Sequence, residues 1–287
     1  AVGRQDEIFA LEKSLNFIKD GGAAVRFVVG RYGSGKSFLI QLARNHALSR
    51  KFIVADADLT PTRRLHGTDG QSLALYRELT RRLSTQSRPE GGALESIIDR
   101  WIQGIQHAVA SDDGLKPGDD VFERAMGRRI GQTLMEMQEL VHGFDFAQVI
   151  TAYYDGFVKG DEDRRANAIR WLRGEFETKT EAKKVLGIGS IIDDSNWYDY
   201  LKVIARFSRE IGYSGLLICI DEMVNLYKIS NAISRKNNYE HVLSILNDCL
   251  QGGAQNIGFL FGGTPESVDD ARRGLFSYEA LRSRLSS

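Results

Sequence analysis

One short segment near the N-terminus, residues 30–37, constrains this chain more than any other. It reads Gly-Arg-Tyr-Gly-Ser-Gly-Lys-Ser and matches the pattern G-x-x-x-x-G-K-[ST] at every defined position. An apolar run at 24–29 precedes it and a helical pattern follows from Phe38, so the loop joins a strand to a helix. In that setting backbone N–H groups surround a polyphosphate, Lys36 reaches its β- and γ-phosphates, and Ser37 offers a hydroxyl to Mg²⁺. The alternative is a glycine-rich turn without a ligand.

The composition excludes several classes of protein. Lys plus Arg and Asp plus Glu balance at 38 each, so no overall charge attracts nucleic acid or an anionic membrane. Cys219 and Cys249 lie far apart in apolar surroundings, which indicates buried thiols of a reducing compartment. No apolar run approaches membrane-spanning length, and the N-terminus lacks a signal-peptide pattern. We therefore expect a soluble, cytoplasmic protein with no membrane contact.

Apolar runs and amphipathic patterns alternate at both ends of the chain. The runs predict strands at 24–29, 52–55, 215–220 and 257–261, and helices are predicted at 4–18, after the glycine loop, at 196–211 and at 238–250. Strands that alternate with amphipathic helices form a parallel sheet covered on both faces. The predicted fold class is therefore α/β, with the glycine loop after the first strand.

The middle of the chain has no strand pattern. Apolar residues recur there at intervals of three or four, which predicts helices over 73–83, 94–109 and 121–140, with more near 146–158, 162–174 and 180–186. We therefore predict a P-loop core formed by 1–58 and 196–287. An all-helical insertion at 59–195 separates the second strand from the third.

The third predicted strand ends in two acids, Asp221 and Glu222. The carboxyl ends of parallel strands face the ligand in open α/β sheets, so both acids are expected beside the glycine loop. Asp221 would hold Mg²⁺ through a water or together with Ser37, and Glu222 would polarise an attacking water. Alternatively, the two acids end a strand as solvated charges.

Two further candidates lie near the C-terminus. Thr264 follows the fourth strand in the turn Gly-Gly-Thr-Pro-Glu and could contact the γ-phosphate or position the water; the alternative is a turn without ligand contact. Arg284, with Arg282 as a second choice, could neutralise developing charge on a neighbouring copy's nucleotide. The alternative is a pair of solvated arginines on a helix.

The segment that follows the second strand is polar and basic. Asp56 and Asp58 end that strand, and we expect them to cap the loop that follows rather than to support Mg²⁺. Over 59–88 six Arg or Lys stand against two acids, the strongest local patch for nucleic acid in this chain. A solvated helix face explains the patch equally well.

The ordered set of motifs resembles a AAA+-type ATPase of the origin-recognition and signal-transduction branch. Residues 2–7, Val-Gly-Arg-Gln-Asp-Glu, resemble the box that packs against adenine in that family, so Gly3 and Arg4 become candidate nucleotide contacts. By the same resemblance Thr264 is the sensor-1 position, and Ser283-Arg284 resembles the serine–arginine finger of clamp loaders. The candidate nucleotide-binding residues are then Gly3, Arg4, Gly30, Arg31, Tyr32, Gly33, Ser34, Gly35, Lys36, Ser37 and Phe38.

A closer resemblance covers the first 110 residues or so. Five segments of this part of the chain together resemble BrxC/BrxD-like ATP-binding proteins of bacteriophage-exclusion (BREX) islands. They are the P-loop region, Ala-Asp-Ala-Asp-Leu-Thr-Pro at 55–61, Arg-Leu-His-Gly-Thr at 64–68, Leu-Tyr-Arg-Glu-Leu at 75–79 and Gly-Gly-Ala-Leu at 91–94. The resemblance implies ATP and Mg²⁺ as ligands and a role in bacterial defence. It also implies action on or near duplex DNA with other defence proteins, as a homo-oligomer when active.

The resemblance to AAA+ domains ends early. Those domains continue past the arginine finger into a fifth strand and a helical lid, whereas this sequence stops at Ser287. We expect the 287 residues to be part of a longer protein. Three functions compete: an ATP-hydrolysing machine, a nucleotide-dependent switch with slow hydrolysis that acts through the helical insertion, and, less favoured, a small-molecule kinase.

Overall fold

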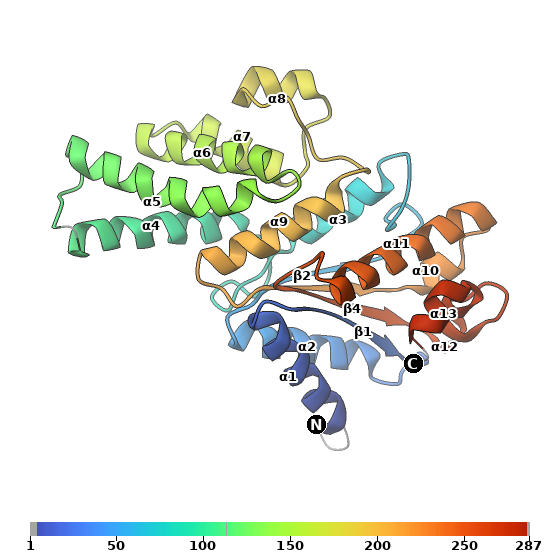
Figure 1. Ribbon diagram of the computed structural model, residues 1–287. Helices are drawn as coiled ribbons and strands as arrows, with labels where there is room; N and C mark the ends of the chain where they lie inside the picture. Colours follow the sequence, from blue (N-terminus) through green and yellow to red (C-terminus); the bar gives the residue numbers. More distant parts are fainter. Residues whose placement is uncertain (1–4, 113, 286–287) are drawn as a thin grey trace.

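The chain folds around a parallel sheet with helices on both faces (Figure 1). The computed structural model describes residues 5–112 and 114–285. Its strands are β1 (Ala23–Val29), β2 (Ile53–Asp58), β3 (Leu216–Asp221) and β4 (Ile257–Gly263). They lie in the order β1-β4-β3-β2, and every neighbouring pair is parallel. The predicted α/β class and parallel sheet are confirmed, and each predicted strand is present within a few residues of its expected bounds.

The helices follow the predicted amphipathic patterns closely. Their bounds are α1 (Gln5–Lys19), α2 (Lys36–Ser49), α3 (Gln71–Arg81), α4 (Leu94–Asp112), α5 (Asp120–Gln138), α6 (Gly143–Lys159), α7 (Glu162–Leu172), α8 (Lys179–Leu186), α9 (Trp197–Glu210), α10 (Val224–Tyr227), α11 (Ala232–Gln251), α12 (Pro265–Asp269) and α13 (Glu279–Leu285), with a 3₁₀ turn at Leu275–Ser277. The pattern predicted α11 only from 238. It begins six residues earlier because Asn231 caps it, its side chain accepting the N–H of Ser234.

Side chains alternate across the sheet and divide the core in two. Val54, Leu217 and Leu260 point to the face covered by α1 and α2. Their neighbours in the same strands point to the other face, where α3, α9 and α11 pack (Figure 1). The edge strand β1 is the least buried strand, whereas every residue of β4 is buried.

The helices between β2 and β3 extend the second of these cores. α4 packs on α5, α5 packs on α6, and both α5 and α6 pack on α9, so their apolar side chains are continuous with those of the sheet. Trp101, Trp171 and Trp197 are all buried in this core. The division at 59–195 stays a prediction, because one hydrophobic core joins this segment to the sheet.

The prediction for Asp56 was wrong. β2 extends to Asp58, so Asp56 lies within the strand instead of at its end. Its carboxylate pairs with Arg44 of α2 at 3.1 Å and with Arg82 at 3.0 Å. A residue that joins a strand to two flanking arginines is not available to cap the following loop.

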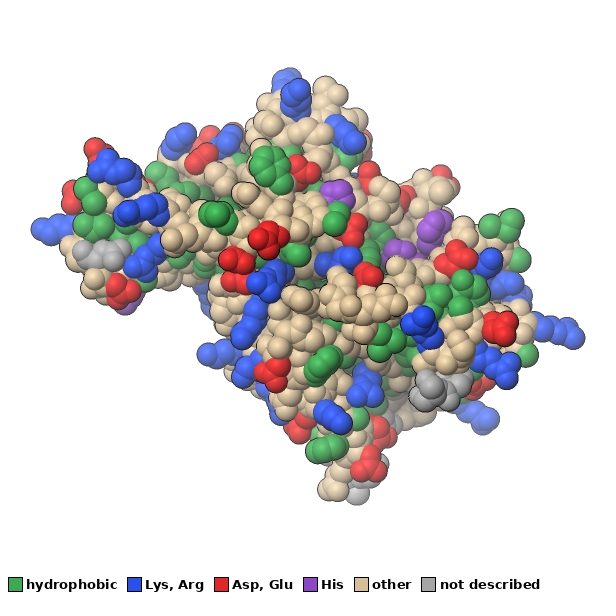
Figure 2. Space-filling view, viewed as in Figure 1, with side chains coloured by type: hydrophobic (Ala, Val, Ile, Leu, Met, Phe, Trp, Pro, Cys, Tyr) green, Lys and Arg blue, Asp and Glu red, His purple; other side chains and the backbone are tan. Residues whose placement is uncertain are grey.

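The cysteines are buried and charges of both signs are mixed on the surface, as the sequence predicts. Cys219 and Cys249 are both free and buried, and burial raises the pKa of each thiol to about 12. Figure 2 shows Lys, Arg, Asp and Glu side chains intermingled over the visible face. Within the described part of the chain, no helix is long and apolar enough to span a membrane.

His241 of α11 is held neutral inside the fold. Its ring stacks on Trp197 with the ring centroids 5.2 Å apart. Burial, helped by nearby His66, lowers the His241 pKa from 6.5 to about 4, against the opposite effect of Asp199 and Asp248. The unfolded chain therefore binds this proton more tightly than the folded chain. The resulting loss of stability develops as pH falls from 6.5 to about 4 and is absent at higher pH.

We predict that His241→Phe reduces the loss of stability in acid, because phenylalanine keeps a flat ring against Trp197 and has no proton to bind. The free energy of unfolding, measured with urea at pH ~7 and ~5, should fall less for the variant than for the wild type. The exposed His107 offers a matched control, and His107→Phe should retain the wild-type pH dependence. Equal losses of unfolding free energy in wild type and His241→Phe would contradict the conclusion that His241 is neutral in the folded chain.

Candidate functional site

The glycine loop adopts a conformation that its glycines permit. Gly33 and Gly35 have φ values of 78° and 82°, in the left-handed region that favours glycine. At Gly30 an added Cβ would lie only 2.3 Å from the Ser34 hydroxyl oxygen. The Gly30 N–H donates to the Gly263 carbonyl at 3.1 Å, which fixes the start of the loop beside the end of β4. The loop therefore lies at the carboxyl edge of the sheet, as predicted.

Lys36 and Asp221 form an ion pair across the base of this loop. The Lys36 Nζ atom lies 2.7 Å from Asp221 Oδ1, and the two side chains are only 10% and 17% exposed. The backbone N–H of Glu222 donates to the same carboxylate oxygen at 2.7 Å. The first residue of α2 and the last residue of β3 are thus joined although 185 positions separate them. The two charges that the sequence assigned to one site are in direct contact.

Glu222 leaves the strand in a strained backbone conformation. Its φ is 62°, which is uncommon for a residue with a side chain and costs on the order of 1 kcal/mol. The conformation is held by the next residues, since Met223 N–H donates to the Gly262 carbonyl and Asn225 N–H donates to the Glu222 carbonyl, both at 2.9 Å. Glu222 therefore departs from the extended geometry of the strand, and its side chain is only partly buried.

Thr264 lies directly after β4 and has a structural role there. It is 5% exposed, and it forms a capping box with Ser267 at the start of α12. The Thr264 N–H donates to the Ser267 hydroxyl at 3.0 Å, and the Ser267 hydroxyl donates to the Thr264 carbonyl at 2.7 Å. The expected contact between Thr264 and a γ-phosphate stays a prediction, because the side chain already caps a helix.

The other predicted residues are distributed over the surface. Arg282 and Arg284 are exposed on α13, which is anchored by the buried Leu281. Several predicted nucleotide contacts are exposed on the loop or on the first turn of α2, namely Arg31, Tyr32, Ser34, Ser37 and Phe38. Gly3 and Arg4 lie outside the described residues.

Two residues of the site were missed by sequence reasoning. An added Cβ at Gly262 would lie 2.2 Å from Asp221 Oδ1 and 2.9 Å from Ile40 Cδ1, so the absence of a side chain makes room for the buried carboxylate. Asn225 donates from its side chain to the Leu59 carbonyl at 2.8 Å, which ties the turn after Glu222 to the segment after β2. The double glycine before Thr264 was a visible signal for Gly262, whereas nothing in the sequence marks Asn225.

The donor atoms of the site suit a hard cation that also binds phosphate. Ser37 supplies a hydroxyl and Asp221 a carboxylate, and Mg²⁺ prefers such oxygen ligands. Among the described residues no cluster of three or more His, Cys, Asp or Glu side chains could hold a metal ion. Mg²⁺ commonly takes one or two protein oxygens and completes its shell with water and substrate phosphates. The residues present therefore fit a metal that binds together with a nucleotide.

Comparison with known proteins agrees with this geometry. A family model described as "BREX system ATP-binding protein BrxC/D" matches residues 1–287, and no curated protein matches the chain. The match covers the P-loop, the strand that ends in Asp221 and the helices between them, so the earlier resemblance to this family is confirmed. The chain belongs to the BrxC/D family of BREX system ATP-binding proteins.

Proposed function

We propose that this protein is a Mg²⁺-dependent ATPase of a bacterial phage-defence system. The observation that carries the proposal is the 2.7 Å contact between Lys36 Nζ and Asp221 Oδ1, with Glu222 directly after it. A phosphate-binding lysine, a metal-holding acid and a candidate base meet at one edge of the sheet. Hydrolysis of a nucleoside triphosphate needs these three functions in this proximity.

Some of these residues bind the nucleotide and others act in the chemical step. The N–H groups of 30–37 surround the phosphates, and Lys36 neutralises charge on the β- and γ-phosphates. Ser37 and Asp221 would hold Mg²⁺, which supplies further charge neutralisation when bound. Glu222 is the candidate base that orients water and accepts its proton, because it directly follows Asp221 at the carboxyl edge of the sheet. Gly3 and Arg4 are the proposed contacts to adenine.

The proposed machine is an oligomer that works with DNA or other defence proteins. Arg284 is exposed on α13, where it could reach the nucleotide of a neighbouring copy. Thr264 is proposed to touch the γ-phosphate from the end of β4, if its capping bonds to Ser267 rearrange. The basic segment 59–88 gives this role little support, because Arg63, Arg81 and Arg82 pair with Glu78 or Asp56.

One observation favours a second candidate, a nucleotide-dependent switch. Leu59, the first residue after β2, donates its N–H to the Asp221 carbonyl at 3.0 Å and accepts from the Asn225 side chain. The buried Asn238 of α11 bonds both the N–H and the carbonyl of His66 further along the same segment. Movement at Glu222 would therefore pull on the chain that leads into the helices, and hydrolysis would only reset the switch.

We predict that Glu222→Gln binds ATP normally and loses at least ~10²-fold in turnover, because the amide cannot accept the proton of water. Lys36→Ala should lose ATP binding itself, since it removes the charge that contacts the phosphates. Turnover is measured by phosphate release and affinity by calorimetric titration with Mg²⁺ present. Equal turnover of wild type and Glu222→Gln would remove Glu222 from the role of base.

We also predict that Gly262→Ala lowers ATP affinity by at least ~10-fold. The new methyl group would lie 2.2 Å from Asp221 Oδ1 and must push that carboxylate away from Lys36. Gly189→Ala is the matched control, because a Cβ at Gly189 meets no atom within 4 Å. If both variants bind ATP like the wild type, the Lys36–Asp221 geometry does not govern nucleotide affinity.

Turnover against protein concentration separates the machine from the switch. An arginine that acts on a neighbour's nucleotide makes specific activity rise with concentration, and Arg284→Ala should flatten that rise. Addition of duplex DNA should raise turnover further if the machine acts on DNA. Slow turnover that is indifferent to both, together with partner binding that differs between ATP and ADP, would favour the switch.

A further inference from the structure

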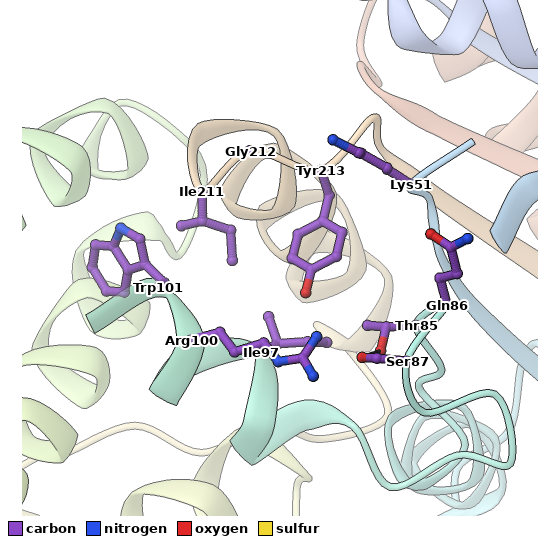
Figure 3. Close-up of a pocket in the computed structure, with 10 residues that line it drawn as sticks. All are labelled: Lys51, Thr85, Gln86, Ser87, Ile97, Arg100, Trp101, Ile211, Gly212 and Tyr213. Atoms are coloured by element: carbon purple, nitrogen blue, oxygen red, sulfur yellow. Dashed lines mark hydrogen bonds between the residues drawn. The ribbon is translucent and has the colours of Figure 1, made fainter. Parts of the chain in front are cut away.

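A hollow lies at the amino edge of the sheet, away from the P-loop. Its volume is about 360 Å³, within the range of ligand sites. It opens between the sheet and the helices that follow β2 (Figure 3). We call this cavity the amino-edge hollow. It is lined by Lys51, Thr85, Gln86, Ser87, Ile97, Arg100, Trp101, Ile211, Gly212 and Tyr213.

The loops that form the amino-edge hollow are fixed to one another by hydrogen bonds. Ser214, next to Tyr213, donates its N–H to the Lys51 carbonyl at 2.9 Å and its hydroxyl to the Arg50 carbonyl at 2.7 Å. Ser84, next to Thr85, exchanges two backbone hydrogen bonds with Val54 of β2, at 3.0 and 2.7 Å. The hollow is therefore preformed, which lowers the entropy cost of binding a ligand.

The charge of the amino-edge hollow is entirely positive. Lys51 and Arg100 are its charged residues, and no Asp or Glu is in the lining. Neither cation forms an ion pair with any residue that the structure describes. In the basic segment 59–88, by contrast, acids neutralise three of the arginines. Lys51 also holds a left-handed backbone, with a φ of 62°, where glycine would be less strained.

A flat ring lies between the two cations. Figure 3 shows the Tyr213 side chain in the hollow, with Lys51 on one side and Arg100 on the other. Burial raises the pKa of Tyr213 although Arg100 opposes it, so this ring is neutral and its hydroxyl remains a donor. The Thr85 and Ser87 hydroxyl oxygens, 3.2 Å apart, and Gln86 add polar groups along one wall.

This hollow cannot be part of the P-loop site. Lys36 is the first residue of α2, and Lys51 follows the end of that helix. The 14 residues of α2 rise ~1.5 Å each, so about 20 Å separate the two sites. β2 and β3 likewise begin near the hollow and end beside Lys36.

We propose that the amino-edge hollow binds a nucleotide unit, either a free nucleotide or one residue of single-stranded nucleic acid. Lys51 and Arg100 contact phosphate, and the hydroxyls of Thr85 and Ser87 support them. Tyr213 stacks on the base, as aromatic side chains do in sites for single strands. Stacking is tolerant of sequence, because every base has a π-face.

The test is anisotropy of a short fluorescein-labelled oligothymidylate titrated with the full chain. The double variant Lys51→Gln, Arg100→Gln should bind it at least ~10-fold more weakly. Tyr213→Ala should lose at least ~5-fold, whereas Tyr213→Phe keeps the ring and should bind like the wild type. The matched control is Arg128→Gln with Lys159→Gln, which removes two exposed cations from α5 and α6 and should have no effect.

Competition then identifies the source of the ligand. Displacement of the probe by AMP indicates a free nucleotide, and displacement only by unlabelled oligothymidylate indicates a strand; either supports the proposal. AMP that binds at the P-loop instead would be insensitive to the Lys51 and Arg100 variants. The proposal fails if the probe does not bind, if the double variant binds it like the wild type, or if oligoglutamate displaces it as well as the nucleotides do.

Discussion

The contact between Lys36 and Asp221 is the interaction around which the rest of this structure is organised. Two largely buried charges cost several kcal/mol to desolvate, and that cost is offset only when they meet with good geometry and further hydrogen bonds. The Glu222 N–H supplies one such bond, and Gly262 leaves the space that the carboxylate needs. β4 lies between β1 and β3, so Gly262 stands between the P-loop that follows β1 and the acid that ends β3.

The two edges of the sheet carry different features. The P-loop, Asp221 and Thr264 all lie where parallel strands end, while the amino-edge hollow lies where β2 and β3 begin. α2 runs between the two edges, from Lys36 to the turn at Lys51, and both of its ends are held by bonds to neighbouring elements. The P-loop and the amino-edge hollow thus lie at the two ends of the same helix.

Much of this fold could be predicted from local patterns, and the remainder depends on contacts between distant residues. The P-loop, the four strands and the helices of the middle segment follow from motif and periodicity, which are properties of neighbouring residues. Asp56 was misplaced because its partners, Arg44 and Arg82, lie on other elements. Asn225 has no motif because its role is one hydrogen bond to a residue 166 positions away. The two cations of the hollow could not be predicted for the same reason, since Lys51 and Arg100 line one cavity only once the chain is folded.

A few polar side chains connect the P-loop site to the middle helices through hydrogen bonds. Leu59 is bonded at its N–H by Asp221 and at its carbonyl by Asn225, so the chain after β2 starts from the turn that holds Glu222. Asn238 then fixes His66, and Asp194 accepts the N–H groups of Gly70 and Leu73 at the start of α3. Each of these bonds is directional and joins one backbone position of the segment to a side chain or backbone group on another element. These bonds connect the turn at Glu222 to the start of α3 through one continuous polar segment.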